Sequence, residues 1–214
     1  MALEILQTLK RAVMECDTEA AANWARKAVG EKVDPLQALD ALTEAIRQVG
    51  DGFGRGDLWL PDLVGAADAM QAAMPIIEEE LKKIGAKREA LGIVVAGTVF
   101  GDIHSIGKSM VCTLLIAGGF EVHDLGVDIK AEEFLEAIDK YQANILAMSA
   151  LLTMTAPEQR KVIGLLKERG IRERVRIMVG GGAITQEFAD EIGADGYDPT
   201  APGAVNLAKR LVGK

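Results

Sequence analysis

Asp102 and His104, one residue apart in the segment Gly97–Ser109, are the side chains whose types and spacing most directly suggest chemistry. A neutral imidazole is a common ligand of transition metals, and its second ring nitrogen usually donates a hydrogen bond to a carboxylate. A zinc site would need more ligands, and the only other histidine, His123, is interpreted as a partly exposed strand residue. By itself the pair also fits a loop histidine that caps the following helix. A single protein ligand would suggest a metal whose other positions are filled by a cofactor.

The same segment ends in Gly107-Lys108-Ser109, which invites comparison with a phosphate-binding loop. The spacing does not fit, because Asp102 occupies the position of the first glycine and Gly101 lies one residue too early. A carboxylate at that position would repel a phosphate. The dinucleotide-binding fingerprint is absent as well. An unrelated nucleotide-binding module is therefore kept only as a third hypothesis, which ATP binding would revive.

From about Leu91 onward, short apolar runs alternate with helical patterns, which predicts parallel strands joined by helices. The expected strands are Leu91–Ala96, Glu121–Leu125, Asn144–Ser149, Val175–Val179 and Gly196–Tyr197. The expected helices are Ile106–Ala117, Ala131–Tyr141, Pro157–Arg169, Thr185–Ile192 and Gly203–Val212. We therefore predict an α/β fold with a doubly wound, five-stranded parallel sheet, Rossmann-like and flavodoxin-like. Ligands of such sheets bind beyond the carboxyl ends of the strands, which directs attention to the loops there. These loops are Gly97–Gly107, Ser149–Ala156, Gly180–Thr185 and Tyr197–Pro202.

From Met1 to about Ile84 the apolar pattern is helical throughout, which predicts four helices packed as a bundle. Asp34-Pro35 has the residue types that open a helix, which we expect to end near Gly50, before a glycine-rich turn at Gly52–Asp57. We place a linker at Gly85–Arg88. The predicted domains are a helical bundle at residues 1–86 and an α/β domain at residues 87–214.

The fourth helix of the bundle begins at Leu60-Pro61, and Trp59 just before it is expected to pack in the bundle. Pro75 lies inside this helix and is expected to kink or split it, because proline removes a backbone hydrogen bond.

Composition excludes several classes of protein. Lys plus Arg is 24 and Asp plus Glu is 32, so the net charge is −8, and a nucleic-acid partner is not expected. No apolar run approaches the ~18 residues of a membrane span. The segment Met1–Arg11 carries Glu4 and lacks an apolar stretch, so no signal peptide is expected. Cys16 and Cys112 form no C-x-x-C pair, which is typical of a reducing cytoplasm.

Three motifs in the α/β half resemble those of the cobalamin-binding corrinoid proteins: Asp102-x-His104-x-x-Gly107, Ser149-Ala150-Leu151-Leu152-Thr153 and Gly181-Gly182. That family includes the cobalamin-binding region of methionine synthase and the methyl-carrier subunits of methanol and methylamine methyltransferase systems. The helical half is similar too, through Gly52-Phe53 and Leu58-Trp59-Leu60-Pro61. The resemblance covers nearly the whole chain, and its motifs fall at three successive strand ends.

The resemblance implies that a corrinoid binds with its dimethylbenzimidazole tail detached from cobalt and threaded into the α/β domain. It makes His104 the lower axial cobalt ligand and Asp102 the hydrogen-bonding partner of His104. The cofactor-binding residues that it implies in this domain are Asp102, Ile103, His104, Ser105, Ile106, Gly107, Ser149, Leu151, Thr153, Gly180, Gly181, Gly182 and Ala201. Taken singly, the glycine run also fits an ordinary strand-to-helix turn, and the two hydroxyls also fit satisfied loop side chains.

In the helical half, the resemblance implies that Phe53, Leu60 and Val64 face the methyl group on cobalt, where an apolar cover would exclude water. The alternative is that these three residues are plain bundle core. The chain departs from the family pattern at Phe100, where lysine is common, and at Ser105, where aspartate is common. Neither departure involves Asp102 or His104.

The function implied by the resemblance is that of a methyl carrier, a non-catalytic subunit holding a methyl group on cobalt. A substrate-specific methyltransferase would load the methyl group and a second methyltransferase would remove it, with a reductive activator as a further partner. The alternatives are an adenosylcobalamin-binding mutase subunit or a cobalamin-dependent sensor. A mutase subunit would not normally need the helical half, and a transcriptional sensor would need a DNA-binding segment. The methyl donor and the oligomeric state stay open at this point.

Overall fold

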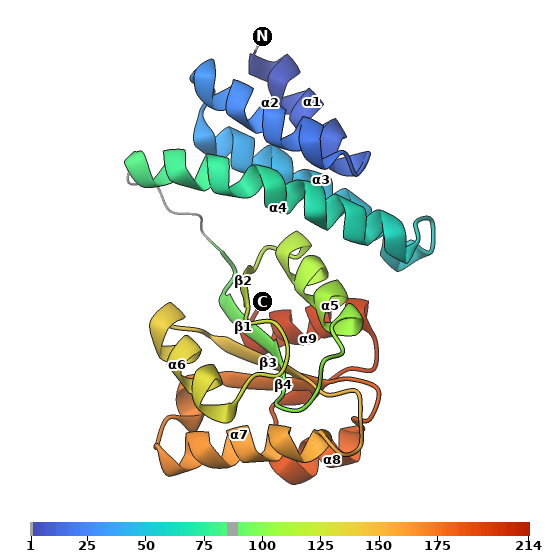
Figure 1. The fold of residues 1–214 in the computed structure, drawn as a ribbon, viewed down its shortest axis with the longest axis vertical. Helices are drawn as coiled ribbons and strands as arrows, with labels where there is room; N and C mark the ends of the chain where they lie inside the picture. The colour runs from blue at the N-terminus through green and yellow to red at the C-terminus, as the bar shows by residue number, and fades with distance from the viewer. Residues whose placement is uncertain (1, 85–89) are drawn as a thin grey trace. The chain divides into compact units, whose positions relative to one another are not determined.

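The computed structural model describes residues 2–84 and 90–214, which form two compact units, one all-helical and one α/β (Figure 1). The helical unit holds α1 (Ala2–Met14), α2 (Thr18–Gly30), α3 (Pro35–Arg55) and α4 (Leu60–Lys83). The predicted linker and the predicted boundary between residues 86 and 87 lie outside the described residues, so the domain limits stay a prediction. Within the described ranges no helix is both long and apolar enough to cross a membrane.

Side chains spaced at helical intervals fill the core of the helical unit, and polar caps set where its helices begin. Leu9 of α1, Leu42 of α3 and Leu63 of α4 are completely buried. The side chain of Asp17 accepts a hydrogen bond from Ala20 N at 2.8 Å, and that of Asp34 accepts one from Leu36 N at 2.9 Å. These caps satisfy amide groups that the first turn of a helix leaves unpaired.

The end of α3 differs from the prediction of a glycine-rich turn at Gly52–Asp57. The helix continues past Gly50 to Arg55 and closes at Gly56, which has a φ of +80°. Gly52 is buried, and a Cβ there would lie 2.9 Å from Leu58 Cδ1. Close packing on the loop that follows therefore stabilises glycine-rich helix whose intrinsic helix propensity is poor.

The expectation that Pro75 splits α4 is wrong, and so is the expectation for Trp59. The helix runs unbroken from Leu60 to Lys83 with Pro75 inside it. The buried side chains Ala73 and Ile77 on either side of Pro75 anchor α4 to its neighbours, which outweighs the one hydrogen bond that proline removes. Trp59 does not pack in the bundle: it is 76% exposed, and its backbone N–H donates to Asp62 Oδ2 at the start of the helix.

The α/β unit confirms the predicted alternation of strands and helices, with bounds that shift by one or two residues. Its strands are β1 (Ile93–Thr98), β2 (Glu121–Asp124), β3 (Ile145–Ser149), β4 (Arg176–Gly180) and β5 (Gly196–Tyr197). Its helices are α5 (Ile106–Ala117), α6 (Ala131–Tyr141), α7 (Ala156–Glu168), the 3₁₀ helix η1 (Arg172–Arg174), α8 (Gln186–Ile192) and α9 (Ala201–Leu211).

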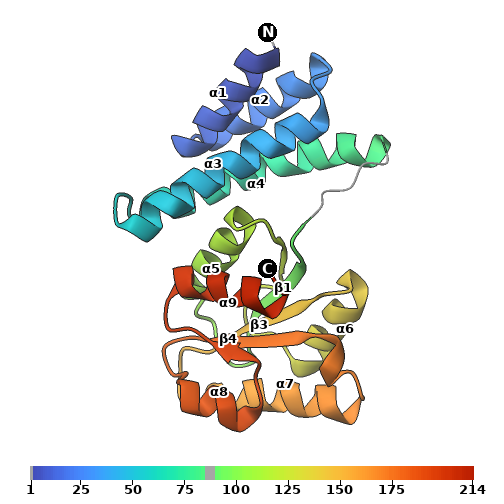
Figure 2. The same cartoon turned by 180° about the vertical axis from the view of Figure 1, so that it is seen from behind.

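All neighbouring strands are parallel, and the order β2-β1-β3-β4-β5 is that of the flavodoxin-like fold. Helices α5 and α9 cover one face of the sheet, and α6, α7 and α8 cover the other (Figures 1 and 2). The two faces carry separate apolar cores, centred on Leu115 and Phe120 on the α5 side and on Phe134 and Leu146 on the α7 side. The predicted fold class is confirmed.

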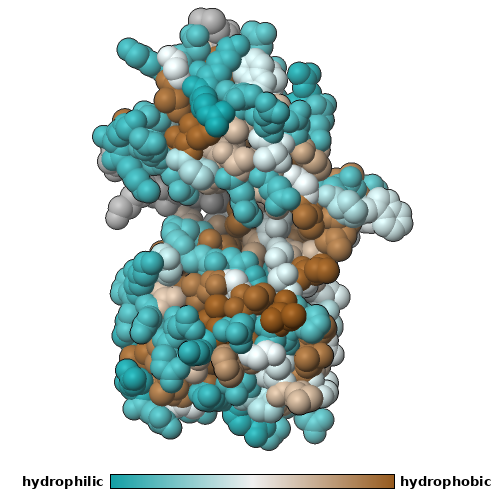
Figure 3. Space-filling view, in the orientation of Figure 1, coloured by the Kyte–Doolittle hydropathy of each residue, from teal (hydrophilic) through white to brown (hydrophobic). Residues whose placement is uncertain are grey.

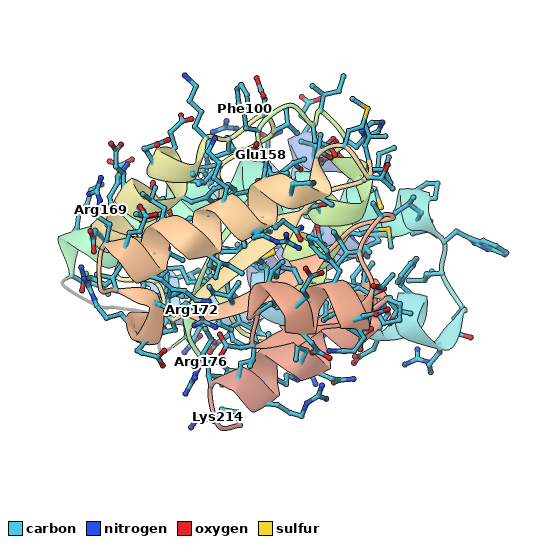
Figure 4. All side chains as sticks on the ribbon, turned by 90° about the horizontal axis from the view of Figure 1, so that it is seen from below. Phe100, Glu158, Arg169, Arg172, Arg176 and Lys214 are labelled. Atoms are coloured by element: carbon cyan, nitrogen blue, oxygen red, sulfur yellow. The ribbon has the colours of Figure 1, made fainter. Side chains whose placement is uncertain are left out.

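The strand register brings three loops to one edge of the sheet. Thr98, Ser149 and Gly180, the last residues of β1, β3 and β4, are direct neighbours across the ladder. In Figure 4, Glu158 in the first turn of α7 and Arg169 just beyond its last turn mark the two ends of that helix. The first turn of α7 follows the loop after β3, so the end at Glu158 is the end nearer this edge. The order of the strands reverses between β1 and β3, which is where flavodoxin-like sheets bind ligands.

Candidate functional site

The loop after β1 holds His104 against a buried carboxylate. The Nδ1 atom of His104 lies 2.7 Å from Oδ1 of Asp102, and the backbone N–H of His104 donates to the same oxygen at 3.0 Å. An ionised carboxylate only accepts hydrogen bonds, so Nδ1 carries a proton, and in the neutral imidazole Nε2 then carries the lone pair. The His104 side chain is 47% exposed, whereas that of Asp102 is completely buried. The imidazole is therefore fixed in tautomer and orientation, and its free nitrogen is available as a ligand.

Asp102 accepts hydrogen bonds from two neighbouring loops. Its Oδ2 accepts from Leu151 N at 2.8 Å, from Leu152 N at 3.3 Å and from the Thr155 hydroxyl at 2.6 Å. Burial by itself would raise the pKa of Asp102, but the hydrogen bonds from Thr155, His104 and Leu151 together lower the pKa well below its usual range. Asp102 stays ionised, and it joins the loop after β1 to the loop after β3 at the point where the strand order reverses.

Thr155 is a site residue that sequence reasoning missed. It is the residue before α7, yet its side chain does not cap that helix. The hydroxyl has one proton and two acceptors within reach, Asp102 Oδ2 at 2.6 Å and Leu152 O at 3.0 Å, and the ionised carboxylate is the stronger acceptor. Its position before Ala156-Pro157 is typical of a helix start. That pattern does not indicate that the hydroxyl donates a hydrogen bond to a carboxylate 53 positions away.

Two further missed residues fix the backbone around the site. The hydroxyl of buried Thr98 donates to His104 O at 3.0 Å, which holds the loop after β1 against the strand end. The amide of buried Gln159 donates to Met148 O at 3.1 Å and to Gly180 O at 3.2 Å. Gln159 lies four residues after Thr155, so both side chains are on the same side of α7 near its start. The hydrogen bonds of Gln159 attach the ends of β3 and β4 to that side of the helix.

A cavity of about 420 Å³ opens on the α5 and α9 side of this sheet edge. Of the predicted site residues, Gly107, Ser149, Gly180, Gly181, Gly182 and Ala201 line it. Because side chains alternate along a strand, Ser149 and Gly180 face the same side as Ala147 and Met178, whose side chains belong to the core on that face. A Cβ at Gly107 or Gly180 would meet no atom within 4 Å, so both glycines border open space.

At Gly181 and Gly182 the backbone of the protein itself favours glycine, apart from any ligand. Gly181 has a φ of +115°, and a Cβ there would lie 2.0 Å from Ala150 O. A Cβ at Gly182 would lie 2.7 Å from the flexible end of Leu151. The glycine run therefore lets the loop after β4 pass directly beside the loop after β3.

The other predicted residues of the α/β unit lie outside the cavity, around His104. Leu151 and Thr153 are exposed on the loop after β3, and Ser105 is half-buried. Large apolar side chains are exposed on the same loops: Phe100, Ile103, Ile106, Leu151, Leu152 and Met154. In the space-filling view, apolar residues gather on one face of the α/β unit among polar ones (Figure 3). Exposed apolar surface next to a free imidazole nitrogen suits a large, flat, partly apolar ligand.

In the helical unit, the three residues expected to cover the cofactor are not all core. Phe53, in the last turn of α3, and Leu60, at the start of α4, are half-buried, and Val64 is 40% exposed. The structure therefore disagrees with the alternative that all three are plain bundle core.

His123 behaves as the sequence predicts. It is partly exposed on β2, its Nε2 lies 2.7 Å from Glu121 Oε1, and its ring stacks on Tyr141 with centroids 3.7 Å apart. Across residues 2–84 and 90–214, no three His, Cys, Asp or Glu side chains gather as a metal site would require. A metal bound at His104 would thus take its other ligands from a cofactor.

Comparison with known proteins gives the family. A family model described as a B12 binding domain matches residues 92–206, and a second model of the same description matches residues 5–78. The chain is 45% identical over 213 residues to dimethylamine corrinoid protein 1 of Methanosarcina mazei, covering 99% of this chain and 98% of the relative. The chain belongs to the corrinoid proteins. This corrinoid protein is also 41% identical over 207 residues to trimethylamine corrinoid protein 2 of the same organism, covering 96% of this chain and 95% of the relative.

A solved structure supports the same assignment for both units. The methanol:cobalamin methyltransferase complex of Methanosarcina barkeri contains a chain with a TM-score of 0.86 and 31% identity, covering 99% of this corrinoid protein and 81% of that chain. The resemblance inferred from the Asp102, Ser149 and Gly181 motifs is confirmed.

The site of this corrinoid protein fits the cofactor that its family implies. A corrinoid would bring most of the ligands of its cobalt with it, which fits a site where the described residues offer one oriented imidazole and no cluster of three metal-binding side chains. The cavity bordered by Gly107 and Gly180 has room for a nucleotide tail.

Proposed function

We propose that this protein is a methyl carrier that binds cobalamin with its benzimidazole tail detached from cobalt and with His104 Nε2 as the lower axial ligand. The observation that carries the proposal is the 2.7 Å contact between His104 Nδ1 and buried Asp102, which leaves Nε2 free and oriented. When bound, the corrinoid supplies a cobalt ion that accepts and releases a methyl group.

The residues of the chain have separate tasks in this proposal. Asp102 holds the imidazole and Thr155 holds Asp102, while Gly107, Ser149 and Gly180 admit the tail to the cavity. The implied contacts of Ile103, Ser105, Ile106, Leu151 and Thr153 with the corrin, and of Gly181, Gly182 and Ala201 with the tail, remain proposals. We assign Phe53, Leu60 and Val64 of the helical unit to an apolar cover that keeps water from the reactive face.

The partners follow from the role. A carrier needs one methyltransferase that loads it and another that unloads it, and a reductive activator that restores the cobalt after oxidation. The similarity to a chain of a methanol:cobalamin methyltransferase complex supports a methyltransferase partner. The relatives named for dimethylamine and trimethylamine make methylated amines the first methyl donors to test, with methanol next. The free thiols of Cys16 and Cys112 suit the reducing cytoplasm predicted for such a protein.

The proposal is tested with purified apoprotein reconstituted with cobalamin and reduced. We expect it to take up a methyl group from a methylated amine in the presence of a dimethylamine or trimethylamine methyltransferase, and to bind methylcobalamin. The alternative function, a mutase subunit or sensor, predicts preferential binding of adenosylcobalamin. Tight adenosylcobalamin binding without methyl uptake from amines or methanol would favour that alternative.

The hydrogen bonds around His104 give a further expectation. Asp102→Asn removes the negative charge of the group that accepts the hydrogen bond from His104 Nδ1. We expect cobalamin affinity or methyl-transfer rate to fall by roughly 10–100-fold. Thr155→Val removes one hydrogen bond to the ionised carboxylate and should cost about 10-fold or less. Equilibrium titration of the apoprotein with cobalamin measures both effects.

The matched control is Glu121→Gln, which alters the carboxylate beside the other histidine, His123. It should leave cobalamin affinity unchanged. If Asp102→Asn bound and reacted as the wild type does, Asp102 would not support His104 as proposed.

A further inference from the structure

The loop between β2 and α6 runs beside the loop that carries His104. Val99 pairs with Ile129 in an isolated parallel bridge beyond the ends of the strands. Thr98 N donates to Gly126 O, and Ile129 N donates to Thr98 O, both at 3.0 Å. These contacts extend the pairing of β1 with β2, so the loop after β1 is held by a segment that none of the site motifs includes.

Beyond this pairing, the loop after β1 makes a tight turn that ends at Asp102. Asp102 N donates to Val99 O at 3.1 Å, and Gly101 has a φ of +79°, as in a type II turn. The turn sets where the backbone of Asp102 lies and in which direction the chain continues to His104. The position of the imidazole therefore depends on this turn as well as on the carboxylate of Asp102.

Asp128 connects the loop after β2 to this turn. Its Oδ1 accepts from Gly101 N at 2.7 Å, and its backbone N–H donates to Asp102 O at 3.0 Å. The carboxylate of Asp102 is held from the other direction, by Leu151 N and the Thr155 hydroxyl. Asp102 is thus fixed by its side chain on the loop after β3 and by its backbone on the loop after β2.

The backbone of Asp128 has a conformation that needs support. Its φ of +59° lies in the left-handed region, which residues other than glycine, asparagine and aspartate rarely occupy. Such a conformation costs free energy and persists where neighbouring contacts hold it. Burial does not explain it here, because Asp128 is exposed, whereas its two hydrogen bonds to the turn do.

From these contacts we propose that Asp128 is a positioning residue, which holds the turn at Gly101 and Asp102 and thereby orients the His104 imidazole toward cobalt. The inference rests on the proposed function, because it takes His104 as the cobalt ligand. Asp128 acts through the backbone of the turn. When its carboxylate is lost, the Gly101 N–H is left to water, the turn gains freedom, and the imidazole is held less firmly for binding.

Two substitutions separate the carboxylate of Asp128 from its backbone conformation. Asp128→Gly adopts a φ of +59° without strain but has no acceptor for Gly101 N–H. Asp128→Asn keeps an oxygen acceptor, and asparagine also tolerates the left-handed region. The proposal therefore predicts a loss in the glycine variant that the asparagine variant largely restores.

The test uses full-length apoprotein uniformly labelled with ¹⁵N and titrated with unlabelled cobalamin. In electron paramagnetic resonance of the Co(II) form, a ¹⁵N ligand from the protein splits the cobalt lines in two, whereas the ¹⁴N of benzimidazole splits them in three. We expect Asp128→Gly to bind cobalamin about 5–10-fold more weakly, with a smaller share of its cobalt showing the two-line splitting at saturation. Asp128→Asn should stay within about twofold of the wild type and keep that splitting.

Glu133 provides a matched control close to Asp128 in the chain. Its Oε2 accepts from Lys130 N at 3.0 Å at the start of α6, so Glu133→Ala also removes an exposed carboxylate that accepts from a backbone amide. That contact does not involve the loop after β1. Glu133→Ala should leave the cobalamin affinity and the two-line splitting unchanged.

The outcomes separate this inference from the proposed function. Absence of the two-line splitting in the wild type would overturn the function, and the positioning role with it. If the wild type shows this splitting and Asp128→Gly equals it in affinity and spectrum, the positioning role is wrong and the function stands. Equal losses in Asp128→Asn and Asp128→Gly would also overturn the positioning role, because the acceptor for Gly101 N–H would then not be the cause.

Discussion

Replacing His104 with alanine should remove the protein nitrogen from cobalt in the reconstituted protein. In the wild type, the Co(II) form should show nitrogen superhyperfine splitting from His104 Nε2, since Nδ1 is engaged by Asp102 at 2.7 Å. In His104→Ala that splitting should vanish. The loss of affinity should exceed the roughly 10–100-fold that removal of a ligand's hydrogen-bonding partner costs, because the ligand itself is gone.

The chain offers a matched control in His123, which also sits beside a carboxylate at 2.7 Å but lies on β2, among residues that do not line the cavity. His123→Ala should retain the splitting and the affinity. The protein should fold in both variants: the His104 side chain is 47% exposed, so its removal leaves no large hole. Unchanged splitting in His104→Ala would show that another nitrogen binds cobalt and that the ligand assignment is wrong.

The fold could be predicted because its signals are local and repeated. Apolar runs of strand length alternating with helical patterns specify a parallel sheet, and β3 and α6 fall within one residue of their predicted bounds. The predictions of helix ends and breaks were wrong where packing overrides a local conformational preference. Gly52–Arg55 looks like a turn by composition, yet it is helix because Gly52 packs on Leu58. Pro75 is tolerated because its neighbours in α4 are buried.

The site was predictable to the extent that its residues are close in sequence. The Asp102–His104 contact joins residues two positions apart, and the sequence alone indicated it. The contact of Thr155 with Asp102 spans 53 positions, and that of Gln159 with Gly180 spans 21. These pairs depend on strand register, which fixes where the three loops meet, and no local motif specifies that register.

Gly181 shows the same dependence on register, and its replacement should have the largest effect on folding. In Gly181→Ala the new Cβ would lie 2.0 Å from Ala150 O, at a residue whose φ of +115° is unfavourable for any side chain. The backbone of two loops, rather than a flexible side chain, must move to relieve this contact. We expect the free energy of unfolding to fall by about 2–4 kcal/mol, from backbone strain and from disturbed hydrogen bonds at the strand ends. Chemical denaturation monitored by circular dichroism measures the change.

Gly180→Ala, one residue earlier, is the control that separates folding from binding. Its Cβ would meet no protein atom within 4 Å, so stability should change by less than about 0.5 kcal/mol. The same methyl group would project into the cavity that we propose for the nucleotide tail, so cobalamin affinity should fall while the fold persists. The two variants are therefore expected to differ in opposite ways. Gly181→Ala should lower mainly the free energy of unfolding, whereas Gly180→Ala should lower the cobalamin affinity and leave the free energy of unfolding unchanged. Equal free energies of unfolding for the two variants would contradict the close passage of the loops after β3 and β4. Unchanged cobalamin affinity in Gly180→Ala would show that the nucleotide tail does not bind in this cavity.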